Sequence, residues 1–150
     1  MTTTGLEPLD ATIHKTNTWL SSVAGCLPGV TRHQAYAALR AVLHALRDRL
    51  SVDEAAHLGA QLPMLIRGLY YEGWHPAGKP LKIRGLEEFL AHVEQELPRD
   101  MGARSDEVAR AVFRVLEQHL DTGETEKIMR ALPRTLRELW EPAIEPRSVE

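Results

Sequence analysis

The sequence predicts an all-α protein, a helical bundle of two tandem repeats of about 70 residues each. Residues 17–72 align with residues 87–142 without a gap, and fourteen of the 56 aligned positions are identical. Apolar residues recur at helical spacing in both segments, and each segment contains a Leu-Pro dipeptide at the same place. What repeats is therefore the spacing of apolar residues and the position of the helix break, which is typical of tandem structural repeats.

The first repeat begins with a predicted helix over residues 10–27. Its apolar residues lie three and four positions apart, Asp10 is a candidate N-cap, and Pro28 ends the run. The capping-box pattern Thr31-Arg-His-Gln34 predicts the start of a second helix. The apolar residues of that helix are Tyr36, Leu39, Leu43, Leu46 and Leu50. Their alternating spacing indicates a seam between two packed helices.

The rest of the repeat is predicted to be one helix that is interrupted and then restarted. Ser51-Val-Asp-Glu54 is a second capping box and predicts a helix over residues 52–61. Leu62-Pro63 follows, and proline lacks the backbone N–H that a helix interior needs but suits the first turn of a new helix. We therefore predict that Pro63 opens a helix with the apolar residues Leu65, Ile66, Leu69 and Tyr70.

The second repeat shows the same order of signals after the Gly- and Pro-rich segment 73–80. Asp121-Thr-Gly-Glu124 reads as its capping box, and Leu132-Pro133 is its helix break. Its apolar positions are Phe89, Val93, Leu97, Ala109, Phe113, Leu116, Leu120, Leu136, Leu139 and Trp140. We expect about eight helices in all, in two similar halves packed around a pseudo-twofold axis.

The two halves are expected to form a single domain, because a helical unit of about 60 residues would be marginally stable alone. The predicted domain covers residues 9–142, with repeats at 9–75 and 83–142. Residues 1–8 and 143–150 are predicted to be flexible tails.

Composition indicates a globular protein without a nucleic-acid or membrane partner. The chain is 43% apolar and carries a net charge of −3, and its arginines are interleaved with acidic residues. Nucleic-acid binding needs excess positive charge on one face. No apolar run approaches the length of a membrane span, and the first residues do not resemble a secretory signal. With a single cysteine, Cys26, the expected location is the cytoplasm.

Several phrases of the sequence resemble a prokaryotic family that is known as domain of unknown function 2267. They are Ala38-Leu-Arg-Ala-Val-Leu43, Leu46-Arg-Asp-Arg-Leu50, Gln61-Leu-Pro63, Arg67-Gly-Leu-Tyr-Tyr-Glu-Gly-Trp74, Gly123-Glu124, Leu132-Pro133 and Leu136-Arg-Glu-Leu-Trp140. The resemblance extends over roughly residues 10–142 and implies an all-helical tandem repeat. It implies no activity, cofactor or catalytic residue.

The most specific hypothesis for an enzymatic function is a metal centre. Glu54-Ala-Ala-His57 and Glu72-Gly-Trp-His75 have the Glu-x-x-His spacing that four-helix di-iron sites use. However, Glu54 is also the third residue of a capping box, and Glu72 stands at a predicted helix end. Nucleophile-elbow, phosphate-loop and dinucleotide motifs are lacking. We therefore expect a protein without enzymatic activity, catalytic residues, metal or other cofactor.

Two further groups of residues are candidate binding sites. Glu54 and Arg67 recur as Glu124 and Arg137, which we interpret as a polar tie across each Leu-Pro break. The alternative is an anion site that uses Arg67 and Arg137 near the pseudo-axis. Tyr71 and Trp74 are partner-binding candidates, because Tyr71 is expected to be an exposed aromatic residue beside a Gly-Trp loop. The alternative is that Tyr71 merely covers the segment between the repeats.

The function that the sequence favours is a helical interaction or scaffold domain, bound to another protein or to a second copy of itself. The alternative is a small-ligand- or metal-binding bundle with a site between the repeats. A closed apolar seam would favour the first function. A roomy pocket lined by Arg67, Arg137 or the Glu-x-x-His pairs would favour the second.

Overall fold

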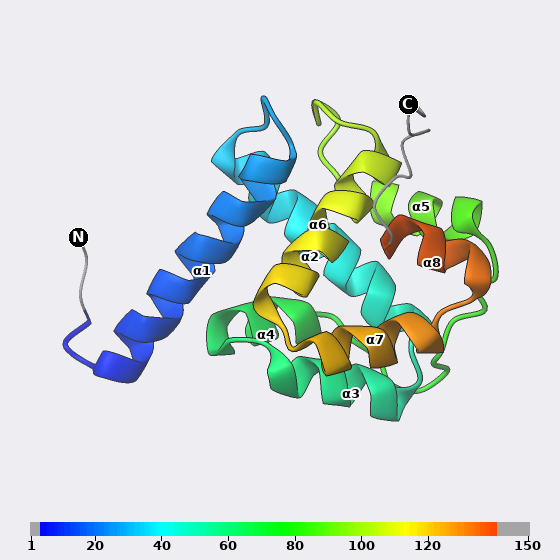
Figure 1. Cartoon of the computed structure of the whole chain (residues 1–150), viewed down its shortest axis with the longest axis horizontal. Coiled ribbons are helices and arrows are strands. Elements are labelled where there is room, and N and C mark those ends of the chain that lie inside the picture. Colours follow the sequence, from blue (N-terminus) through cyan, green and yellow to red (C-terminus); the bar gives the residue numbers. More distant parts are fainter. Residues whose placement is uncertain (1–3, 141–150) are drawn as a thin grey trace, which may run out of the picture.

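The protein is described by a computed structural model, which places residues 4–140. These residues form eight α-helices and no strands, so the predicted all-helical fold is confirmed (Figure 1). The helices are α1 (Glu7–Cys26), α2 (Arg32–Arg49), α3 (Val52–Gln61), α4 (Met64–Tyr71), α5 (Leu86–Glu94), α6 (Ser105–His119), α7 (Thr122–Ala131) and α8 (Arg134–Trp140). Within the described residues, none of these helices is long and apolar enough to span a lipid bilayer.

Helices α2 and α6 lie at the centre of the bundle and cross each other (Figure 1). Helix α2 contacts α1, α4 and α5, and α6 contacts α1, α5, α7 and α8. Helices α3 and α7 lie side by side along one edge of the molecule. The two central helices are therefore the ones whose apolar residues define the core.

The core is filled mainly by aliphatic side chains from the predicted seams. Leu39, Leu43 and Leu46 of α2 are fully buried, as are Phe113 and Leu116 of α6. Aromatic residues join this core from other helices, and the ring of Phe113 packs 4.4 Å from that of Trp140. The alternating apolar spacing predicted correctly most of the buried faces of α2 and α6. The exception is Tyr36, which the spacing places in the seam but which is 39% exposed near the start of α2.

Two of the three predicted capping boxes are present. The side chains of Thr31 and Ser51 each accept a hydrogen bond from the backbone three residues later, and Gln34 and Glu54 return one. The predicted box at Asp121 is wrong, because Asp121 makes no capping hydrogen bond. Its intended partner, Glu124, has a carboxylate oxygen 2.6 Å from His57 Nε2 on α3. A contact between helices has replaced the local one.

Both Leu-Pro dipeptides lie at junctions between helices. Leu62 is the C-cap of α3 and Pro63 the N-cap of α4, so Pro63 lies one residue before the first turn in which the sequence places it. Leu132 is the C-cap of α7, and α8 begins directly after Pro133. The proline carbonyl oxygen then accepts a hydrogen bond from the backbone of Arg67 or Arg137, which starts the new helix.

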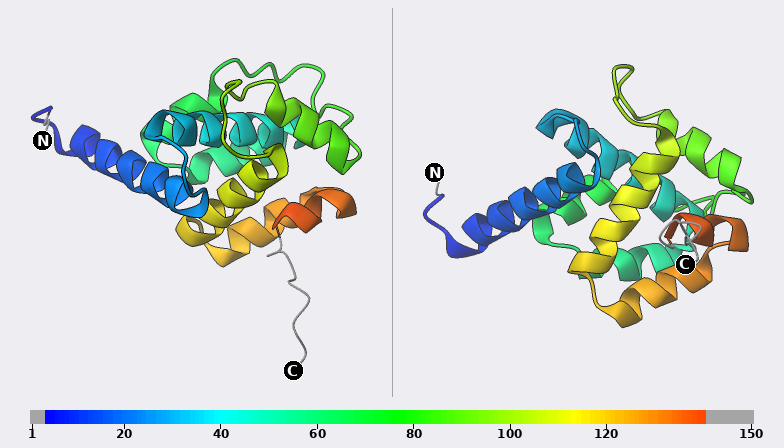
Figure 2. Two further views of the ribbon diagram at one scale, coloured as in Figure 1. Left: turned by 90° about the horizontal axis from the view of Figure 1, so that it is seen from above. Right: turned by 45° about the horizontal axis from the view of Figure 1, so that its top comes forward.

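The first helix is longer than expected. It begins at Glu7 with Leu6 as its N-cap, so Asp10 lies inside the helix and the prediction of Asp10 as the cap is wrong. The carboxylate of Asp10 instead accepts hydrogen bonds from the backbone and the hydroxyl of Thr4. Figures 1 and 2 show that the N-terminal half of α1 projects away from the rest of the bundle.

The segment between α4 and α5 is fastened to the end of α2. Helix α4 ends at Tyr71, and Gly73 has a φ of 79°, the left-handed conformation that commonly ends a helix. Further along, the backbone N–H of Leu81 donates to the carbonyl of Asp48, and Arg49 Nε donates to the carbonyl of Ile83. These bonds position α5 beside α2.

Candidate functional site

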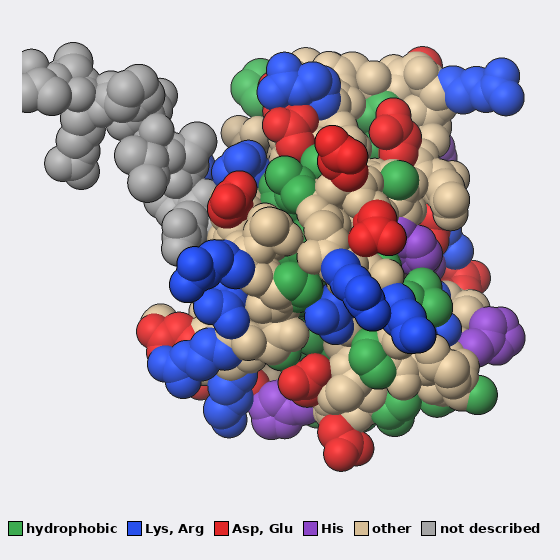
Figure 3. Space-filling view, turned by 90° about the vertical axis from the view of Figure 1, so that its right-hand side faces the viewer, with side chains coloured by type: hydrophobic (Ala, Val, Ile, Leu, Met, Phe, Trp, Pro, Cys, Tyr) green, Lys and Arg blue, Asp and Glu red, His purple; other side chains and the backbone are tan. Residues whose placement is uncertain are grey.

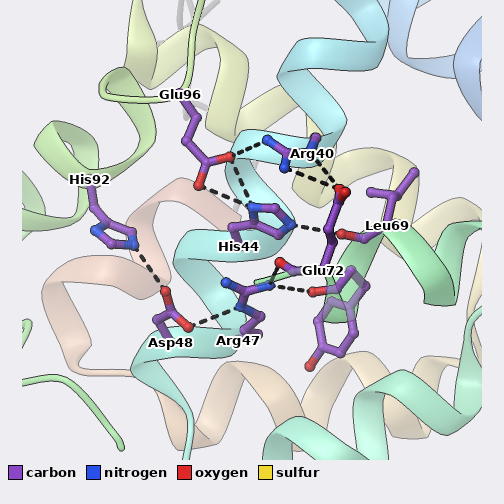
Figure 4. A network of polar contacts seen from close by, with 9 residues as sticks. Arg40, His44, Arg47, Asp48, Leu69, Glu72, His92 and Glu96 are labelled. Atoms are coloured by element: carbon purple, nitrogen blue, oxygen red, sulfur yellow. Dashed lines mark hydrogen bonds and ion pairs between the residues drawn. The ribbon is translucent and has the colours of Figure 1, made fainter. Parts of the chain in front are cut away.

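A network of polar side chains interrupts the apolar core where α2 meets α4 and α5 (Figure 4). His44, Arg47 and Asp48 of α2 are buried, although α2 is otherwise apolar on this face. Buried polar groups are costly unless they are hydrogen-bonded. The partners of these three residues therefore determine what the network does.

Arg47 and Asp48 connect α2 to both neighbouring helices. Arg47 Nε donates to Asp48 Oδ1 at 2.9 Å, and Arg47 Nη1 donates at 2.7 Å to the carbonyl oxygens of Tyr70 and Glu72. These carbonyls belong to the last turn of α4, where helical partners are lacking. The other carboxylate oxygen of Asp48 lies 3.2 Å from Nε2 of His92 on α5.

His44 is held between two acceptors. Its Nδ1 lies 2.9 and 3.0 Å from the carboxylate oxygens of Glu96, and its Nε2 lies 2.7 Å from the carbonyl oxygen of Leu69. His44 therefore links the segment after α5 to the last turn of α4. Arg40 adds a further contact to Glu96 at 3.0 Å and pairs with Glu72 at 3.1 Å.

This network has a structural role. Each carboxylate and cation named above is engaged with another group of the chain, and the bonds end on the last turn of α4 and on the segment from His92 to Glu96. The sequence analysis did not identify this network or its contacts to α4 and α5. The only local signal for them was three polar residues inside the apolar face of α2.

Asp48 should make the stability of the protein depend on pH. Burial alone raises the pKa of this carboxyl, but the hydrogen bond from His92 and the ion pair with Arg47 outweigh it and hold the pKa below its ordinary value of 3.8. Because the folded-state pKa is the lower one, Asp48 stabilises the fold fully above the unfolded pKa. This contribution is lost as pH falls through the folded-state pKa.

We therefore expect the stability difference between the parent protein and Asp48→Asn to shrink steadily as pH falls below about 5. Urea unfolding at a series of pH values measures this difference. Asp106→Asn is the control for a carboxyl near the surface. A hydrogen bond from exposed Arg104 also lowers the pKa of Asp106, but this carboxyl is not buried as Asp48 is. A difference for Asp48→Asn that stayed constant down to pH 3 would contradict this assignment.

The structure does not bring the four candidate metal ligands together in one site. Glu54 accepts a hydrogen bond from the backbone of Ser51 at 3.0 Å, whereas His57 pairs with Glu124. Glu72 pairs with Arg40, and the carbonyl of exposed His75 accepts a hydrogen bond from Lys79. Among residues 4–140, no three His, Cys, Asp or Glu side chains are grouped as a metal site requires. The absence of a bound metal stays a prediction.

A crevice of about 500 Å³ lies between α3 and α7. His57 and Glu54 line it from α3, together with Lys127 of α7. The rest of the lining consists of charged Asp53 and Arg130 and of apolar Leu50, Ile128 and Ala131. A crevice that combines apolar surface with polar groups can hold a small ligand, so this is where the alternative function would be located.

Arg67 and Arg137 cap the ends of helices, and the predicted polar ties to Glu54 and Glu124 are not formed. Arg67 donates to the carbonyls of Gly59 and Leu62 at 2.9 and 2.8 Å. Arg137 does the same at the end of α7, where Met129 and Leu132 accept its Nε–H at 3.1 Å. The carbonyls of Gly59 and Met129 also accept a bond from the backbone of Leu62 and Leu132, but the residue four positions on is a proline without an N–H in each case. The guanidinium therefore supplements the donors that the helix breaks remove.

The aromatic candidates Tyr71 and Trp74 are half-buried and pack on each other, with ring centroids 5.4 Å apart. Tyr71 lies across α3 so closely that a Cβ on Gly59 would come within 2.9 Å of the tyrosine ring. Its hydroxyl donates a hydrogen bond to the carbonyl of Ala56 at 3.4 Å. These contacts favour the covering role for Tyr71, and its binding to a partner stays a prediction.

Most of the exposed large hydrophobic side chains among the described residues lie on α1 and α4 or at their starts. Of the six large hydrophobic side chains exposed in residues 4–140, four lie at the starts of these helices. They are Leu6, Leu9, Met64 and Leu65, with exposed fractions of 58, 38, 51 and 48%. We call these four residues the α1–α4 surface. The two helix starts touch, because the backbone N–H of Leu65 donates to the hydroxyl of Thr12 at 3.0 Å.

A groove of about 570 Å³ runs between the same two helix starts. Its apolar lining comes from α1 and from the α3–α4 junction, including Pro8, Ala11 and Met64. Lys15 and Arg67 add positive charge to it. By contrast, basic and acidic side chains are interspersed on the face shown in Figure 3, and the apolar patches there are small.

The chain can also be compared with known proteins. A family model described as an uncharacterized conserved protein (DUF2267) matches residues 16–139. No curated protein matches the chain. The match includes the phrases on which the resemblance was based, except for Trp140 at the end of the last one, and covers far more than half of the sequence. The chain therefore belongs to the DUF2267 family.

Proposed function

We propose that this protein is a non-enzymatic helical interaction domain that binds its partner through the α1–α4 surface. The observation that carries this proposal is the gathering of four exposed apolar side chains at two touching helix starts, beside a groove. A contiguous exposed apolar area on a folded domain commonly marks a site of protein association. The single cysteine supports a cytoplasmic location as part of the proposal.

The second half of the chain supports a binding role for this surface. Met64 and Leu65 align with Arg134 and Thr135, which begin α8 and are exposed. A helix that starts after a Leu-Pro break can therefore carry polar residues at these positions. Folding therefore does not require apolar residues at the exposed positions of α4, which supports a role in binding.

The proposal includes two structural repeats related by a pseudo-twofold axis, because duplicated helical units chiefly provide surface. The contacts support this relation: α1 packs on α2 and α4 as α5 packs on α6 and α8. Contacts between the halves also correspond, since α1 meets α6 as α5 meets α2. The boundaries of α3 and α7 lie exactly 70 positions apart.

A photo-crosslinking amino acid at position 65, introduced in cells, tests the proposed function. We expect one discrete crosslinked product, because a partner bound to the α1–α4 surface covers Leu65. The matched control carries the same amino acid at position 36, since Tyr36 is also exposed but lies on α2. Absence of a product specific to position 65 would remove the basis of the proposal.

The crevice between α3 and α7 favours a second candidate function, the binding of a small ligand between the repeats. A native mass spectrum of the purified protein separates this candidate from the first. A ligand bound in the crevice would add a defined mass to the chain, and His57→Ala would remove it.

A further inference from the structure

Apolar residues continue along α1 beyond the core of its own chain. A stripe with alternating spacings of three and four positions runs along α1 from its N-cap to its C-cap. Its apolar members are Leu6, Leu9, Ile13, Leu20, Val23 and Leu27, and Thr16 occupies the middle position. The last three are buried, whereas Leu6 and Leu9 are exposed and Ile13 is half-buried. This spacing is that of helices packed side by side. The first half of the stripe therefore has the pattern of a helix contact without a full complement of neighbours.

This overhang is a feature of α1 alone. Helix α1 has 20 residues and α5 has 9, so the first half of α1 has no helical counterpart in the other half of the chain. Figure 2 shows this part of α1 standing clear of the bundle in two further directions. A second protein can therefore approach the overhang.

The charges around the α1–α4 surface are complementary to each other. The first turn of α1 carries Glu7 and Asp10. The groove beside it carries Lys15 and Arg67. A second copy whose α1 runs in the opposite direction would bring its acidic first turn to the basic groove, and the same contact would form twice around a twofold axis.

We infer from these features that the α1–α4 surface binds the same surface of a second copy of the chain, with the two α1 helices antiparallel. This inference rests on the proposed function and names its partner. The buried apolar residues would be Leu9 and Leu65 with their neighbours, and the charged residues would fix the direction of the helices.

Sedimentation of the purified full chain tests the inference. We expect a dimer of the 16.8 kDa chain that Leu9→Lys dissociates, with an affinity loss of about thirtyfold or more, the usual effect of a central interface residue. Tyr36→Lys is the matched control, because Leu9 and Tyr36 are 38 and 39% exposed. Thermal unfolding should show that both variants remain folded.

A charge exchange tests the antiparallel arrangement. Glu7→Lys and Lys15→Glu should each weaken the dimer, because each places like charges at both ends of the contact. The double variant restores opposite charges and should regain most of the affinity. If none of these substitutions changed the affinity of the dimer, the antiparallel arrangement would be wrong.

A chain that remains monomeric at about 100 µM, well above the dissociation constants of specific homodimers, would overturn the inference. The proposed function would still stand if the crosslinked product at position 65 were a different protein. It would fail only if that position gave no specific product.

Discussion

Arg47→Met should lower the free energy of unfolding by about 3–5 kcal/mol. The substitution keeps most of the volume of the side chain but removes the guanidinium. Asp48 then loses its cationic arginine partner and keeps the contact with His92, and the carbonyls of Tyr70 and Glu72 lose the donor that Arg47 provides. Urea unfolding at pH 7 measures the loss. A decrease below about 1 kcal/mol would show that water replaces the guanidinium without difficulty.

Two controls separate the effect of burial from that of charge. Arg104→Met removes an arginine that pairs with Asp106 on the surface, and it should change stability little. Adding Asp48→Leu to Arg47→Met should recover part of the loss, since no unpaired carboxylate then remains in the core. A double variant less stable than Arg47→Met would indicate that Asp48 stabilises the fold mainly through His92.

Leu46→Ala and Leu116→Ala should each cost about 2–5 kcal/mol, because both side chains are fully buried in the two central helices. Truncation removes apolar contacts and leaves a cavity that the crossed helices cannot easily fill. Leu65→Ala is the control, since about half of this side chain is exposed. Losses below about 1 kcal/mol at both central positions would contradict the core that is described above.

Sequence reasoning succeeded where a structural feature depends on neighbours in the chain. The capping boxes of Thr31 and Ser51 formed as predicted, because each needs only the next three residues. The burial of Leu46 and Leu116 also followed from spacing along one helix. Such features are determined by the local pattern.

Sequence reasoning failed where a side chain forms its hydrogen bond or ion pair with a residue far away in the sequence. Glu124 has the spacing of a capping residue, but it pairs with His57, 67 positions earlier. The role of Arg67 was missed for another reason: its partners are backbone carbonyls, which no side-chain pattern reveals. The groove between α1 and α4 depends on tertiary packing and has no local signal.

The arginines that cap the ends of α3 and α7 also bear on the order in which the chain folds. Arg67 bonds to residues only five and eight positions earlier, whereas His44 and Glu96 are 52 positions apart. Closing a short loop costs less entropy than closing a long one, so each helical corner can form early. Arg67 should then influence chiefly the folding rate, while the long-range network of α2 should govern how slowly the finished bundle unfolds.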